Sequence, residues 1–135
     1  LIENSISTIN PDIVYTHSPM DINKDHEIVA NAVLVALRPM RFKKNKNFEI
    51  RAFETPSSTD QSPNLNKFIF LPNLYISIDG TWIKKVKGLK CYKYELGNYP
   101  HPRSIKNIEA LAIKRWAEAG LKKAEVFMIL KKVLN

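Results

Sequence analysis

Residues 12–26 read DIVYTHSPMDINKDH, and this stretch decides the fold that the sequence predicts. The β-branched run 12–16 is typical of a short buried strand. Asn23 is a good helix N-cap, and Asp25 favours the positively charged start of the helix that would follow. Residues 17–26 thereby place two histidines, two aspartates and an asparagine at a strand–helix junction, where open α/β sheets bind ligands.

The neighbouring segments alternate between helical and strand patterns. Residues 1–9 have the apolar spacing of a helix, which Asn10-Pro11 ends. The helix after the first strand is predicted to end at Arg38-Pro39, and residues 48–53 alternate with the period of a strand. That helix is expected to bury one stripe, Ile28, Val29, Ala32, Val33, Ala36 and Leu37. The alternation predicts a parallel, Rossmann-like layered α/β sheet that lacks its first βα units.

The second half of the chain begins with a predicted loop over residues 55–67, rich in Pro, Ser, Thr, Asn and Asp. Loops of this length are often functional or mobile. Residues 68–71 and 74–78 are predicted to be strands, and residues 82–96 and 105–119 are predicted to be helices. For the last segment, residues 123–134, we favour a strand over a helix.

Composition limits the possible classes of function. The 135 residues suit one domain, and no apolar run is long enough for a transmembrane segment. The lone Cys91 excludes an intramolecular disulfide, is expected at a buried helix position, and fits a cytoplasmic setting. The net charge of +8 accompanies no recognised nucleic-acid-binding motif, so we expect no nucleic acid partner. Solvated helix faces, or attraction of an anionic substrate or surface, would account for the charge.

Two groups of residues could carry chemistry. His26 would lie in the first turn of its helix, either as a metal ligand supported by Asp25 or Asp21, or as a surface histidine. The prolines around His101 would hold it rigidly just before a helix, next to Arg103. These two side chains either contact substrate and transfer protons or belong to a stiff, solvated loop.

The order of several motifs resembles the PIG-L (LmbE-like) N-acetylglucosaminyl deacetylases over nearly the whole chain. The matching motifs are Pro11 to His17, Asp21-x-Asn23-x-Asp25-His26, Ala36 to Pro39, Phe70-x-Pro72-Asn73-x-Tyr75, Lys87-x-Leu89-x-x-Tyr92-x-x-Glu95, Pro100 to Ser104, Leu111-Ala112 with Arg115, Gly120, and Ala124-Glu125-x-Phe127. The resemblance implies a zinc-dependent hydrolase that deacetylates an N-acetylated sugar.

The resemblance also implies roles for individual residues. His26 would be the third zinc ligand, and Asp25 is its neighbour in the same motif. Many family members have a histidine where this chain has Asn23, which can donate a hydrogen bond but not a proton. We therefore expect His101 to take over part of that catalytic role. Arg103 would bind substrate hydroxyls or a phosphate, and His17 is a weaker candidate for the same pocket.

One family motif is absent from these residues. No His-x-Asp-Asp sequence occurs, so two of the three zinc ligands and the general base are missing. Residues 1–135 are therefore expected to be the single-domain C-terminal portion of such a deacetylase, inactive alone. The alternative is a non-enzymatic basic α/β module that binds an anionic glycan, a lipid headgroup or a protein partner. A homo-oligomer or a partner chain could cover the exposed edge of the sheet.

Overall fold

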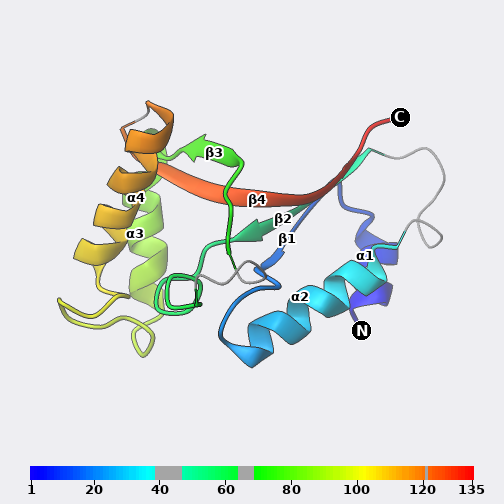
Figure 1. Ribbon diagram of the computed structural model, residues 1–135, viewed down its shortest axis with the longest axis horizontal. Coiled ribbons are helices and arrows are strands. Elements are labelled where there is room, and N and C mark those ends of the chain that lie inside the picture. The colour runs from blue at the N-terminus through cyan, green and yellow to red at the C-terminus, as the bar shows by residue number, and fades with distance from the viewer. Residues whose placement is uncertain (39–46, 64–68, 121) are drawn as a thin grey trace. The chain divides into compact units, whose positions relative to one another are not determined.

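The computed structural model describes residues 1–38, 47–63, 69–120 and 122–135. Its helices and strands follow one another along the chain as α1 (Ile2–Ile9), β1 (Ile13–His17), α2 (Lys24–Ala36), β2 (Phe48–Phe53), β3 (Leu74–Ser77), α3 (Trp82–Cys91), α4 (Ile105–Ala119) and β4 (Ala124–Val133), with a short 3₁₀-helix at Asp79–Thr81 (Figure 1). The mixed α/β class predicted from the sequence is confirmed.

The sheet is mixed rather than all-parallel. Its strand order is β1-β2-β4-β3. β1 and β2 pair in parallel, with His17 opposite Phe53, as the alternation in the first half predicted. β4 runs antiparallel to β2, with an irregularity between Ile50 and Arg51, so the predicted parallel sheet is wrong for this pair.

Contacts within the chain divide it into two compact units. The first comprises residues 1–73 and 127–135, and the second comprises residues 74–126. The first unit therefore holds α1, β1, α2, β2 and most of β4. The second unit holds β3, α3, α4 and the start of β4.

The core of the first unit joins α2 to β2. Its buried members are Val33, Leu37, Phe48 and Ile50, and burying a side chain as large as Leu37 or Ile50 stabilises the fold by about 2 kcal/mol. α1 and α2 both lie on one side of β1 and β2 (Figure 1). The buried residues of α2 are Ala30, Val33 and Ala36. The predicted stripe is wrong for Ile28, Val29 and Ala32, which are exposed. Ile28 and Ala32 lie off the buried face, whereas Val29 lies on it, one turn before Val33, and is still 41 % exposed.

α2 and α4 begin, and α4 ends, where capping chemistry predicts. The Asn23 side chain accepts a hydrogen bond from the Asp25 backbone N–H at 3.0 Å, and Ser104 accepts one from the Asn107 N–H at 3.2 Å. α4 ends at Gly120, whose φ of 70° is in the left-handed region that favours glycine. Of the predicted strand 123–134, residues 124–133 form β4.

Three predictions for the second half need correction. Residues 69–71 are not a strand. Residue 68 lies outside the described residues, as do residues 64–67 of the predicted loop. α3 ends at Cys91 instead of Leu96, because the side chains that follow are exposed and no core stabilises a longer helix. Cys91 is exposed rather than buried, since nine residues from Trp82 place it on the opposite face of the helix.

β1 lies at an edge of the sheet, and Ile13 and Tyr15 on this strand are exposed. The expectation that a partner chain or a second copy covers the edge stays a prediction. None of the helices within the described ranges combines the length and apolar character that a bilayer crossing requires.

Candidate histidine and aspartate site

Two histidines meet where β1 ends and α2 begins. His17 is the last residue of β1, and His26 is the third residue of α2. Their rings stack with centroids 3.9 Å apart and planes 9° apart. The register of β1 against β2 also brings Phe53 to His17, with ring centroids 4.7 Å apart. The strand–helix junction that the sequence singled out therefore brings these two predicted site residues together.

A buried carboxylate lies beside this pair. The side chain of Asp21 is 0 % exposed, and its Oδ2 lies 3.1 Å from His26 Nδ1. The same carboxylate accepts hydrogen bonds from the Ser58 hydroxyl, from the Thr59 hydroxyl at 3.0 Å, and from the Asn23 backbone N–H at 3.0 Å. Four donors thus satisfy one buried carboxylate, which is the condition for burying such a charge. We call His17, Asp21, His26, Ser58 and Thr59 the histidine–aspartate centre.

The loop after β2 supplies two of these donors and is held in place by its own hydrogen bonds. The Thr55 backbone N–H donates to Thr59 Oγ1 at 2.8 Å, and Ser62 Oγ donates to the Met20 carbonyl at 2.8 Å. Ser57 has a φ of 68°, a left-handed conformation that is uncommon for a residue other than glycine. These contacts fix the loop against the β1–α2 connection.

The surroundings of the centre shift the pKa of two of its groups. Burial alone would raise the pKa of Asp21. The hydrogen bonds from Ser58, Asn23, His26 and Thr59 outweigh burial, so the pKa of Asp21 is lowered and the group is ionised near neutral pH. Burial lowers the pKa of His17, the nearby His26 lowers it further, and Asp21 opposes both. His17 Nδ1 is buried and has no hydrogen-bond partner among the described residues.

The centre suits one metal ligand, His26. An ionised Asp21 can only accept, so the hydrogen bond at 3.1 Å places the proton of a neutral His26 ring on Nδ1 and leaves Nε2 as the electron-pair donor. Metal-binding histidines are commonly oriented by such a carboxylate. The parallel ring planes of His17 and His26 prevent their in-plane electron pairs from meeting at one ion. Within the described ranges, no group of three His, Cys, Asp or Glu side chains could hold a metal.

Asn23 and Asp25, predicted as catalytic residues, lie at the start of α2. Both are exposed. The Asn23 side-chain oxygen caps α2 through the Asp25 N–H, so only its amide NH₂ is left to donate to a ligand. Of the two carboxylates considered as support for His26, Asp21 is the one whose contact with the ring is seen.

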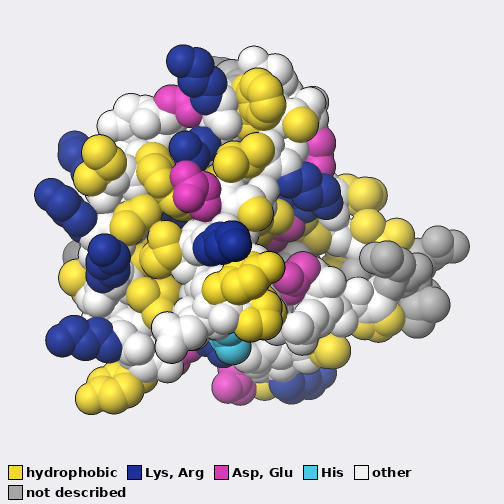
Figure 2. All heavy atoms as spheres, turned by 90° about the vertical axis from the view of Figure 1, so that its left-hand side faces the viewer, with side chains coloured by type: hydrophobic (Ala, Val, Ile, Leu, Met, Phe, Trp, Pro, Cys, Tyr) yellow, Lys and Arg dark blue, Asp and Glu magenta, His cyan; other side chains and the backbone are white. Residues whose placement is uncertain are grey.

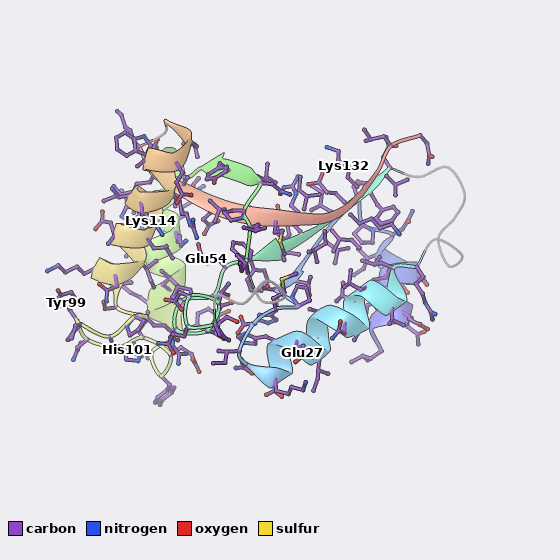
Figure 3. All side chains as sticks on the ribbon, viewed as in Figure 1. Glu27, Glu54, Tyr99, His101, Lys114 and Lys132 are labelled. Atoms are coloured by element: carbon purple, nitrogen blue, oxygen red, sulfur yellow. The ribbon has the colours of Figure 1, made fainter. Side chains whose placement is uncertain are left out.

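His101 lies in the second unit, in the loop before α4 (Figure 3), and Arg103 follows it two residues later in the same loop. The Arg103 backbone N–H donates to His101 Nδ1 at 3.1 Å, and the Arg103 guanidinium pairs with Glu95. Asn107 donates to the His101 carbonyl at 2.9 Å. A Cβ added at Gly97 would lie 2.3 Å from His101 Cγ, so the ring rests directly on the glycine backbone. These contacts hold the His101 ring against its own loop, and the residue is exposed.

Sequence reasoning missed Ser58 and Thr59. They lie in the predicted loop 55–67, and a run of three adjacent hydroxyl residues, 57–59, between two prolines was the signal available. Asp21 was recognised only as one of two possible supports for His26.

Comparison with protein-family models and with curated proteins gives no match to this chain.

Proposed function

We propose that this chain is part of a zinc-dependent deacetylase that hydrolyses the acetamide of an N-acetylglucosamine-type sugar conjugate. The observation that carries the proposal is the contact between His26 Nδ1 and the buried carboxylate of Asp21 at 3.1 Å. A histidine oriented in this way is suited to metal ligation. It occupies the position at which the resemblance to the PIG-L deacetylases requires a zinc ligand.

His26 would hold the metal through Nε2, and Asp21 would keep the ring in place. When bound, zinc lowers the pKa of a water ligand toward about 7 and polarises the acetamide carbonyl. Catalytic zinc sites usually take three protein ligands. Residues 39–46, 64–68 and 121 contain no His, Cys, Asp or Glu, so the remaining ligands would come from another segment or another chain.

The other predicted site residues retain roles in this proposal. Because His101 Nδ1 accepts the Arg103 N–H, a neutral His101 ring carries its proton on Nε2 and could donate it to the leaving amine. Arg103 would bind substrate hydroxyls or a phosphate in competition with Glu95. The amide NH₂ of Asn23 would donate to the substrate carbonyl. Asp25 remains the acidic neighbour of His26, and His17 would line the same pocket.

The first test is a zinc titration followed by the side-chain nitrogen signals of the histidines. We expect the His26 Nε2 signal to shift most, and Asp21→Asn to weaken zinc binding by about 10- to 100-fold. His17→Ala is the matched control, and it should leave the zinc affinity nearly unchanged. An equal affinity in His26→Ala, or a dominant shift at His17, would contradict the assignment.

The second test measures acetate release from N-acetylglucosamine conjugates in the presence of zinc. The chain alone should be inactive, and turnover should appear when a segment with a His-Pro-Asp-Asp motif is added. Turnover by the chain alone would disprove the proposal that another segment or another chain supplies part of the zinc site. In the active combination, unchanged turnover in His101→Ala would remove His101 from the mechanism.

A further inference from the structure

The positive charge of the protein is concentrated in the second unit. Residues 74–126 contain eleven Lys and Arg and five Asp and Glu, a net charge of +6 out of the total of +8. On the side of the molecule that carries α3 and α4, Lys and Arg side chains alternate with hydrophobic ones (Figure 2). The rest of the chain is nearly neutral, so electrostatic attraction of an anionic partner would act mainly through this unit.

The acidic residues of this unit are already engaged. All four glutamates form ion pairs, which are Glu95–Arg103, Glu109–Lys123, Glu118–Arg115 and Glu125–Lys85. Asp79 accepts a hydrogen bond from Ser77 at 3.1 Å. Both arginines of the unit are therefore paired. Within the described residues, Lys84, Lys87, Lys90 and Lys93 have no ion pair.

These unpaired lysines share one surface. Lys84, Lys87 and Lys90 follow one another at a spacing of three, which places them on the same side of α3, and Lys93 lies just beyond its end. All four are exposed. The opposite side of the helix carries the half-buried Trp82, Val86 and Leu89.

Apolar side chains are exposed next to the lysines. Ile83 is 71 % exposed and lies on the same side of α3 as Lys87 and Lys90. Tyr92, which is 66 % exposed, and Tyr94, which is fully exposed, flank Lys93 in the sequence at the end of the helix. We call the four lysines together with Ile83, Tyr92 and Tyr94 the α3 surface. It combines unpaired positive charge with aliphatic and aromatic groups that no core residue covers.

We propose that the α3 surface binds an anionic lipid bilayer surface. Lysines near such a surface are attracted to acidic headgroups, and several lysines act together. Tyrosine is suited to the headgroup level because its ring is apolar and its hydroxyl is polar. An exposed isoleucine gains by leaving water for the acyl boundary, which is how helices that lie on membranes bind.

Two features favour lipid over nucleic acid as the occupant. The unpaired cations are all lysines, while the two arginines, which suit bidentate contacts with phosphate and bases, are held by glutamates. Ile83 gains by entering an acyl boundary but offers no face on which a base could stack, so a lipid surface would use Ile83 as well as the lysines and the tyrosines. The inference is independent of the proposed deacetylase function, because it involves neither His26 nor His101.

The test is co-sedimentation of the whole chain with vesicles. Vesicles of phosphatidylcholine with phosphatidylserine should bind the protein, and vesicles of phosphatidylcholine alone should not. The variant Lys84→Gln/Lys87→Gln/Lys90→Gln should bind about a hundredfold more weakly. Ile83→Ser should weaken binding by about fivefold. Raising the salt concentration should weaken the wild type and affect the triple variant less.

The charge-matched control is Lys24→Gln/Lys114→Gln/Lys122→Gln, which removes three exposed lysines outside the α3 surface. Near-wild-type binding of this control, with loss in the α3 variant, supports a localised site. Equal losses in the two variants would overturn the proposal, since total charge would then decide binding. Tighter binding to a single-stranded oligonucleotide than to anionic vesicles at the same salt would overturn it as well.

Discussion

The histidine–aspartate centre and the α3 surface both contain charged side chains, but these side chains differ in burial and in their partners within the protein. In the centre, one buried carboxylate has four hydrogen-bond donors around it. On the α3 surface, four exposed lysines have no ion pair among the described residues. Buried charge must be satisfied internally or the fold is destabilised, whereas exposed charge is solvated and stays available to a partner.

Because of this difference, mutations in the two regions are expected to have different effects. Changes in the centre should first affect folding, and through it any activity. Changes on the α3 surface should leave folding intact and affect binding alone. The largest effect on stability is expected at Asp21.

Asp21→Ala should lower the free energy of unfolding by about 3 kcal/mol. The variant removes the acceptor for the Ser58 and Thr59 hydroxyls and leaves these donors buried without a partner. Urea unfolding measures the effect. Asp25→Ala is the control, because Asp25 is exposed and its loss should cost about 0.5 kcal/mol through the helix dipole. Equal losses of unfolding free energy in both variants would show that the buried Asp21 contributes no more to stability than the exposed Asp25.

Gly97→Ala should lower the free energy of unfolding by about 2 kcal/mol. The added Cβ would lie 2.3 Å from His101 Cγ, so the ring or the loop must move. Gly88→Ala is the matched control in the same unit. No atom lies within 4 Å of its Cβ position, and alanine in a helix should raise stability by about 1 kcal/mol. A neutral Gly97→Ala would show that His101 is not held against the glycine.

The features predicted correctly from the sequence depend on local chemistry. The Asn23 and Ser104 caps and the Gly120 helix end each involve residues close together in the chain, so their signals are visible in a short window. The alternation over residues 48–53 gave β2 with its observed bounds. The choice of strand over helix for β4 was also confirmed.

The features that were missed depend on contacts between distant residues. Ser58 and Thr59 meet Asp21 across 37 and 38 residues, and no periodicity records such a pairing. The antiparallel direction of β4 depends on its pairing with β2, which no local pattern specifies. The exposure of Ile28 depends on which side of α2 meets β2, and the apolar pattern of α2 alone does not specify that side.

Acid should weaken the first unit through Asp21. The folded-state pKa of Asp21 is lowered, so its contribution to stability is fully present above its unfolded pKa of 3.8 and is lost as pH falls through the folded value. The loss should be smaller than in Asp21→Ala, because a protonated carboxyl still fills its site. Urea unfolding between pH 7 and pH 3 measures it. In Asp21→Asn the free energy of unfolding should depend less on pH than in the wild type. The same pH dependence in both proteins would contradict the assignment of the acid effect to Asp21.

Tyr94→Ser should have the smallest effect on folding. The side chain is fully exposed, so the free energy of unfolding should change by less than about 0.5 kcal/mol. Binding to anionic vesicles should nevertheless fall, because an aromatic ring is lost from the α3 surface. Thermal unfolding and vesicle co-sedimentation on the same sample separate the two effects. If Tyr94→Ser lowers the free energy of unfolding, the ring packs against the protein. Tyr94 would then not be an exposed side chain that serves binding alone.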